Sequence, residues 1–172
     1  PINLQLQIHR LSGPAAERDH SAMFTLIHRR QHLRIPRAHG AVGGKVGVHC
    51  GPRHAELIEE LPPSELKVMA DPDGLRTILN NLISNAIHYT PGGGRVTVTV
   101  RPDGERALFE VRDTGVGIAR EHQVRVFERF YRVDKARSRS IGGTGLGLAI
   151  VKHLVEVMNG EVALESALGY GV

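Results

Sequence analysis

Residues 81–89 read NLISNAIHY and lie within residues 74–89, where apolar side chains recur at helical spacing. The pattern predicts one amphipathic helix with an apolar stripe of Leu75, Ile78, Leu79, Leu82, Ile83 and Ala86. Asp71-Pro72-Asp73 offers N-cap residues before it, and TPGGG at 90–94 ends it. At about 100° per residue, Asn81, Asn85 and His88 share a narrow sector away from the stripe. This polar row is the first candidate for a binding site.

Short elements surround this helix. An apolar run predicts a strand over 67–70, and alternating Val and Thr predict another over 96–100. A turn at 102–104 leads into 106–113, which returns as the second arm of a hairpin. Helices are expected over 119–128 and 148–158, and a strand over 161–166. This order predicts an α/β two-layer sandwich, a mixed sheet covered by helices on one face.

Composition narrows the class of protein. The 172 residues are 41% hydrophobic and 23% charged, which excludes wholesale disorder. A single cysteine excludes an internal disulfide, and no apolar run approaches the roughly 18–20 residues of a membrane helix. The net charge is +4, but seven aromatic residues and no Trp leave little material for stacking on bases. We therefore expect no direct binding of nucleic acid.

The charge is distributed unevenly along the chain. Residues 1–54 hold eight Lys or Arg, two acids and seven of the ten histidines. The composition changes just before Leu61-Pro62-Pro63, and paired prolines indicate a boundary. We predict a basic, His-rich segment over 1–61 and a main domain over 62–172. Residues 17–35 could form an amphipathic helix, whereas 36–54 show no clear pattern of strand or helix.

Glycine-bearing segments could meet a nucleotide. Gly40–Lys45 fails as a Walker loop because Val46 replaces the Ser or Thr that binds magnesium, and the G-x-G-x-x-G fingerprint is absent. In DTGVG at 113–117, Asp113 is in phase with the apolar residues of its strand, so its carboxylate should be buried and need a partner such as a ligand amino group. The alternative is a simple Asp-Gly turn.

A second glycine cluster, GTGLG at 143–147, opens a predicted helix and offers free amides to phosphate oxygens. The basic loop 129–139 precedes it and would suit a triphosphate. Asn oxygens on the helix 74–89 are hard ligands that suit magnesium. The alternatives are a solvated polar helix face and a glycine hinge in a surface loop.

Four segments together resemble the motifs of sensor histidine kinases. Residues 81–91 resemble their N box, 113–118 the G1 box, 126–131 the F box and 143–151 the G2 box. The resemblance implies the GHKL, or Bergerat-type, ATP-binding fold over about 62–172. It implies Mg²⁺ on Asn85 and phosphate support from Asn81. It also implies that Asp113 accepts from the adenine amino group in a pocket shaped by Gly115 and Gly117, and that Tyr89 lines the nucleotide cleft. Arg132 and Arg137 would reach the phosphates, and the remaining residues would close over them: Gly143, Thr144, Gly145, Leu146, Gly147 and Leu148. His88 stands where the family usually has Lys.

The resemblance implies a protein-histidine kinase that transfers the γ-phosphate of ATP to a histidine on a dimerisation domain and serves a response regulator. The full-length protein would be a homodimer, and this part would be cytoplasmic even in a membrane-bound kinase. A regulatory module of the anti-sigma-factor kind is one alternative, and the F-box residues Phe127 and Phe130 argue against it. A GHKL ATPase is another, disfavoured because Asn81 stands where those enzymes carry a Glu base.

Both ends of the chain depart from the family pattern. His9 has a loosely similar spacing to a phospho-acceptor, but Arg10 replaces the usual acid. Only 72 positions separate His9 from Asn81, which is short for two long helices, so we expect poor self-phosphorylation of this chain. We expect the strand that the family adds after residue 166 to be missing. Two groups of residues are candidate zinc ligands, but neither has a standard zinc-binding spacing: His28 with His32, and Cys50 with nearby histidines.

Overall fold

A computed structural model describes residues 1–9, 23–26, 48–50, 55–133 and 144–168. The main sheet has six strands in the order β3-β4-β6-β7-β1-β8, in which only β4 and β6 run parallel. A second sheet pairs β2 with β5. The strands are β1 (Ile2–His9), β2 (Met23–Leu26), β3 (Val48–Cys50), β4 (Ala55–Glu60), β5 (Leu66–Met69), β6 (Arg95–Asp103), β7 (Arg106–Asp113) and β8 (Glu161–Ser166).

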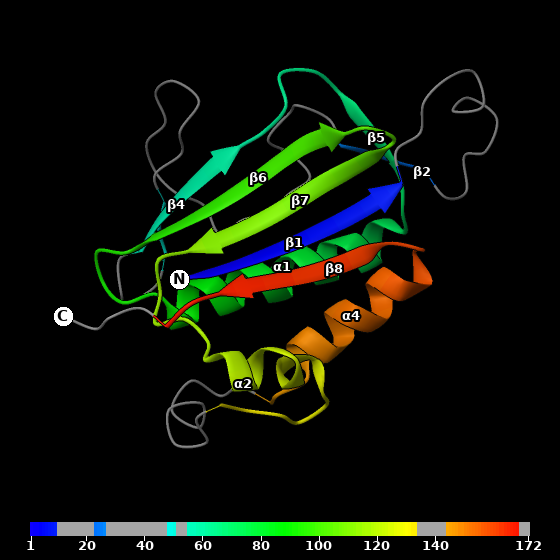
Figure 1. Ribbon diagram of the computed structural model, residues 1–172. Helices are drawn as coiled ribbons and strands as arrows, with labels where there is room; N and C mark the ends of the chain where they lie inside the picture. Colours follow the sequence, from blue (N-terminus) through cyan, green and yellow to red (C-terminus); the bar gives the residue numbers. More distant parts are fainter. Residues whose placement is uncertain (10–22, 27–47, 51–54, 134–143, 169–172) are drawn as a thin grey trace.

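The helices cover one face of the main sheet (Figure 1). They are α1 (Pro72–Tyr89), α2 (Arg120–Gln123), the short 3₁₀ helix η2 (Arg125–Phe127) and α4 (Gly147–Val157). α1 lies against β6 and β7, while α4 packs beside α1 and against β8. The predicted two-layer arrangement of a mixed sheet with helices on one side is confirmed. The core lies between these layers and brings together the predicted stripe of α1, the inward side chains of β1, β6 and β7, and Val151 and Val155 of α4.

α1 begins and ends where local chemistry requires. The Asp71 carboxylate accepts a hydrogen bond of 2.6 Å from the Gly74 amide, and proline occupies the first helical position. At the other end, the buried Thr90 hydroxyl donates to the carbonyl of Ala86 at 2.6 Å. The helix therefore starts two residues before the predicted start at 74 and ends at Tyr89, as expected.

Strand β1 lies inside the sheet, between β7 and β8. Ile2 pairs with Asp113 on one side and with Ser166 on the other. Leu4, Leu6 and Ile8 point into the core, because apolar and polar residues alternate strictly along this strand. The predicted boundary at residue 62 therefore does not bound the sheet, since β1 and β4 precede it and belong to it. β1, from the N-terminal part of the chain, lies beside β8. β8 is the edge strand of the sheet as far as the structure describes it.

Three other local predictions differ from the structure. Residues 23–26, expected within an amphipathic helix, form β2, which pairs with β5. Residues 48–50 form β3 although no strand was expected there. The helix expected over 119–128 is broken into α2 and η2, and neither of them buries a residue. Phe127 of η2 is only partly buried against the core, so little apolar burial favours one continuous helix over two short turns.

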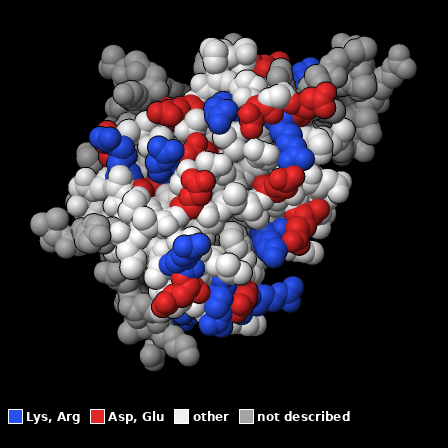
Figure 2. Space-filling view, viewed as in Figure 1, with Lys and Arg blue, Asp and Glu red and all other residues white. Residues whose placement is uncertain are grey.

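The sheet face turned away from the helices carries charges of both signs (Figure 2). Opposite charges pair across strands: Arg95 of β6 lies 3.1 Å from Glu56 on neighbouring β4, and Arg106 of β7 reaches past β1 to Glu161 of β8 at 2.7 Å. This face is a mixed-charge surface rather than a basic one. Within the described residues, no helix is long and apolar enough to cross a membrane.

Candidate functional site

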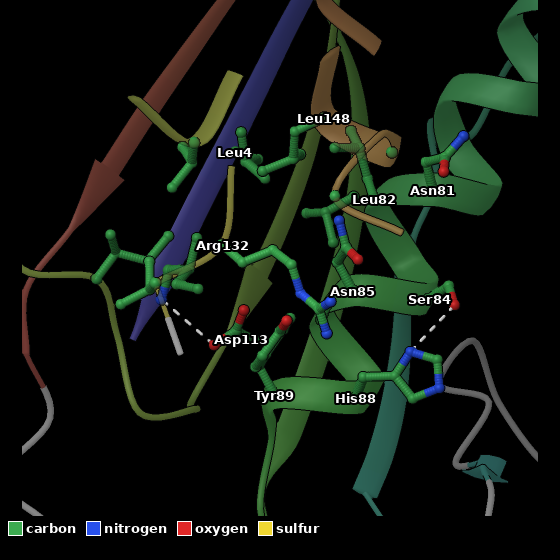
Figure 3. Close-up of a pocket in the computed structure, with 18 of the residues that line it drawn as sticks. Leu4, Asn81, Leu82, Ser84, Asn85, His88, Tyr89, Asp113, Arg132 and Leu148 are labelled. Atoms are coloured by element: carbon green, nitrogen blue, oxygen red, sulfur yellow. Dashed lines mark hydrogen bonds between the residues drawn. The ribbon is translucent and has the colours of Figure 1, made fainter. Parts of the chain in front are cut away.

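A cavity of about 400 Å³ opens beside the C-terminal half of α1 (Figure 3). The start of β1 and the end of β7 form one wall. Residues 116–118 and 126–133 form the next, and residues 144–148 at the start of α4 close the other side. The cavity thus gathers segments that are far apart in the sequence around a single helix.

Asp113 is the buried carboxylate of the cavity, with 3% of its surface exposed. One oxygen, Oδ1, accepts hydrogen bonds from the amides of Gly115 at 2.7 Å and Ile2 at 3.3 Å. Burial raises the pKa of Asp113, and these two amides, the Gly115 bond first, oppose the rise. Because both bonds go to Oδ1, neither engages Oδ2. The carboxylate therefore keeps an acceptor that a ligand donor in the cavity can use.

The turn after Asp113 needs glycine at Gly117. Its φ of +75° lies in the left-handed region, and a side chain there would collide with the carbonyl of Ala167. Ile118 follows, and its amide donates to the Ser166 hydroxyl at 2.9 Å. Residues 116–118 therefore form a wall of the cavity whose backbone path depends on glycine at position 117.

The polar row of α1 faces this same cavity. Asn81, Asn85 and His88 all line it, and Figure 3 shows them one above another along the helix. The Asn81 amide donates to the carbonyl of Thr77 at 2.9 Å, which fixes the direction of its oxygen. A Cβ placed on Gly147 would stand 2.8 Å from that oxygen, so a larger residue there would push the Asn81 side chain out of its present position.

Arg132 supplies a guanidinium inside the cavity. Figure 3 shows its side chain reaching across the cavity toward Asn85 and Tyr89. Its Nε and Nη2 atoms are buried and have no hydrogen-bond partner among the described residues. Buried donors of this kind are costly unless they are paired, and an anionic ligand would pair them.

The cavity has one acceptor at its buried end, amide oxygens and a cation along its side, and glycines before a helix. This combination suits an adenine nucleotide. Residues 70–172 match the family model described as histidine kinase-, DNA gyrase B-, and HSP90-like ATPase. This chain belongs to that family.

Individual relatives in the family agree with this assignment. The chain is 46% identical over 121 residues to the sensor histidine kinase WalK of Bacillus subtilis, covering 69% of this chain and 20% of WalK. It is 51% identical over 109 residues to the sensor-like histidine kinase SenX3 of Mycolicibacterium smegmatis, covering 63% of this chain and 28% of SenX3. The solved structure of a mycobacterial sensor histidine kinase, MprB, aligns with a TM-score of 0.51 at 38% identity, over 59% of this chain and 66% of that one.

The chain therefore spans between a fifth and about a quarter of the length of these two curated relatives. The family match and the relatives establish an ATP-binding catalytic domain of the sensor histidine kinase kind.

Most of the family residues expected at the site line the cavity. They are Asn81, Asn85, His88, Tyr89, Asp113, Gly117, Arg132, Thr144, Gly145, Gly147 and Leu148. Gly115 does not line the cavity, but its amide donates a hydrogen bond to Asp113. Leu146 is the residue that precedes α4. Arg137 and Gly143 lie outside the described residues.

Ile2 and Leu4 are cavity residues that the sequence analysis did not assign to the site. Their signal was present in the alternating pattern of INLQLQIH, which is typical of a strand buried on one face. Tyr131 and Val126, at the two ends of the F-box segment, also line the cavity. Sheet position cannot be derived from alternation alone, so the partner of this strand was not foreseeable.

The described residues contain no cluster of three or more His, Cys, Asp or Glu side chains that could hold a metal. Magnesium in this family's site would instead depend on amide and phosphate oxygens. Asn85 fits that role, because its amide lines the cavity between Asn81 and His88 and offers a hard oxygen. When bound with the nucleotide, the ion would neutralise phosphate charge.

Proposed function

We propose that this domain binds Mg-ATP in the cavity and donates the γ-phosphate to a histidine on a separate dimerisation domain. The observation that carries the proposal is Asp113, buried with Oδ1 occupied by two amides and Oδ2 left for the adenine amino group. The base would lie between α1 and the Gly117 turn. The phosphates would lie between Asn81, Asn85 and the start of α4.

The residues available favour transfer over hydrolysis. Hydrolysis of ATP needs a base that takes a proton from water, and Asn81 cannot do so at neutral pH. The Asn81 amide is moreover held by Thr77 at 2.9 Å. Arg132 would bind phosphate, and Tyr89 would line the base pocket. Catalysis would then depend on positioning and charge neutralisation, which phosphoryl transfer requires.

A partner domain is supported by exposed apolar side chains beside the cavity. Val124 is 85% exposed and Phe130 is 71% exposed, and both belong to the segment between β7 and α4. Phe130 also has a φ of +65°, held by its amide bond of 2.8 Å to the carbonyl of Gly145. A bulky residue in this strained conformation, and exposed, suits a contact with another protein. We propose that this contact is with the dimerisation domain, and that a cytoplasmic response regulator receives the phosphate.

The described part of the chain places its own candidate acceptor far from the cavity. Ile2 and Leu4, near one end of β1, line the cavity, whereas His9 ends the same strand. At about 3.3 Å per residue, the five steps from Leu4 to His9 span roughly 17 Å. A histidine at that distance cannot meet the γ-phosphate in line without leaving the sheet.

Labelling with γ-³²P-ATP tests the proposal. The chain alone should bind Mg-ATP and label itself weakly, and adding the dimerisation domain of a sensor histidine kinase in trans should produce a phosphate that is stable to base and labile to acid. The Asn85→Ala variant, folded but unable to hold the metal, is the matched control and should give no label. Strong self-labelling of residues 1–172 that disappears in His9→Ala would overturn the proposal, as would fast phosphate release without protein label.

A further inference from the structure

Tyr131 is held at three points before the chain reaches Arg132. Its hydroxyl lies 2.7 Å from Nδ1 of His122, and the guanidinium carbon of Arg125 lies 4.3 Å from its ring centre. Its amide donates to the carbonyl of Glu128 at 3.3 Å. Tyr131 therefore has little freedom to rotate, although residues 131–133 belong to no helix or strand.

The helix that carries His122 is itself anchored to the sheet. The Gln123 side-chain amide donates to the carbonyl of Ser166 at 2.8 Å, and to the carbonyl of Ile118 at 2.9 Å. α2 is thereby tied to the end of β8, although it buries none of its own residues. A chain of contacts runs from β8 through Gln123 and His122 to Tyr131.

The neighbours of His122 indicate how its ring bonds Tyr131. Glu121 Oε1 lies 3.5 Å from Nε2, so we assign the ring hydrogen to Nε2. Nδ1 is then an acceptor, and the Tyr131 hydroxyl donates to it. The two rings also meet at a centroid distance of 6.1 Å.

Arg132 depends on this arrangement. Its Nε and Nη2 atoms are buried in the cavity without a partner among the described residues, so no hydrogen bond from these two atoms holds the side chain there. Its position is set from the backbone, and the nearest fixed group is Tyr131. We propose that His122 is a positioning residue that holds Tyr131, and through it Arg132, in place for the phosphates of ATP. This inference rests on the proposed function, because it names what orients the phosphate-binding cation.

The test compares ATP with adenosine, which lacks the phosphates. In His122→Phe an aromatic ring stays and the acceptor is lost, so we expect magnesium-dependent ATP affinity to fall about three- to ten-fold. Adenosine affinity should change less than about two-fold, since Asp113 is untouched. His153→Phe, an exposed histidine on α4, is the matched control and should leave both ligands unaffected.

Further variants separate positioning from structure. Tyr131→Phe should show the same selective loss, and the double variant should lose no more than the worse single variant, because both remove one bond. Arg132→Gln should weaken ATP binding and make His122→Phe silent. His122→Gln retains an acceptor and should recover part of the affinity, which also covers the case in which the Phe variant does not fold.

Three results would overturn the positioning role. They are equal losses of affinity for ATP and adenosine in a folded variant, no loss of ATP affinity in His122→Phe, and additive losses in the double variant. Failure of the unsubstituted chain to bind ATP would instead reject the proposed function itself. Calorimetry on the 172-residue chain measures all of these affinities.

Discussion

Asp113 uses its two oxygens for different purposes. Oδ1 binds the amides of Gly115 and Ile2 and so fixes the end of β7 to the start of β1. Oδ2 is the atom that we propose reads the base. Burial raises the pKa of this carboxyl, so the ionised form that ligand binding needs is disfavoured by the fold.

Because burial disfavours the charge on Asp113, we predict that Asp113→Asn does not destabilise the nucleotide-free domain at neutral pH. A folded-state pKa above the unfolded value contributes stability that is present at low pH and is lost as the pH rises through the raised pKa. The Asn oxygen can keep both amide bonds without the charge. In urea titrations, the variant should be at least as stable as the unsubstituted chain at pH 7, and this relative advantage should shrink in acid, below the raised pKa. The exposed Asp103→Asn serves as control. A clear loss of stability at pH 7 would show that the charge itself stabilises the fold.

Asn85 allows a second prediction at the residue scale. Its amide faces the phosphate side of the cavity, so Asn85→Ala should weaken Mg-ATP binding about ten-fold or more and remove its dependence on magnesium. Adenosine should bind as before. Asn80→Ala, a change at an exposed residue of α1 outside the cavity lining, is the control, with affinities measured at several magnesium concentrations. Equal losses for adenosine and Mg-ATP would mean that this helix face does not see the metal.

At the scale of elements, β1 joins the two ends of the described chain. It pairs with β7 on one side and β8 on the other, and the hydroxyl of Ser166 donates to the carbonyl of Pro1 at 2.8 Å. Leu6 lies in the middle of this strand with none of its surface exposed, opposite Phe109 and Val162. The strand should therefore carry a large share of the core's stability.

We expect Leu6→Ala to lower the free energy of unfolding by about 2–5 kcal/mol, the usual result of opening a cavity in a core. Gln5→Ala, on the opposite face of the same strand, should change it by less than about 1 kcal/mol. Urea denaturation followed by circular dichroism compares the two. Equal effects, or none for Leu6, would mean that the first nine residues are not part of the domain.

Elements with a strong local pattern were predictable from the sequence. Each local pattern predicts both the type of element and its buried face. This holds for the apolar stripe of α1, the hairpin of β6 and β7, and the alternation along β8. The same reasoning placed Asn81, Asn85 and His88 on one face and turned Asp113 inward. The place of β1 was not predictable, because strand pairing between residues 2, 113 and 166 depends on the whole sheet. The division of residues 119–128 into α2 and η2 was not predictable either, because it depends on how little of this segment its neighbours bury.

At the scale of the whole molecule, the cavity is where distant segments meet. β1 and β7 supply the base side, α1 supplies the polar row, and the start of α4 supplies the glycines. Two polar groups of the cavity are held by hydrogen bonds: the Asn81 side-chain amide by the carbonyl of Thr77, and Oδ1 of Asp113 by the amides of Gly115 and Ile2. Groups that are already held in place reduce the entropy lost when a ligand binds.

The most direct measurement is the ratio of ATP to GTP affinity in the unsubstituted chain and in Asp113→Asn, by calorimetry with magnesium. Oδ2 of Asp113 should accept from the amino group of adenine and repel the carbonyl oxygen of guanine at the same position. We predict that ATP binds at least about ten-fold more tightly than GTP, and that the Asn variant loses most of this preference. Equal affinities for ATP and GTP in the unsubstituted chain, or an unchanged ratio in a folded Asn variant, would contradict the account.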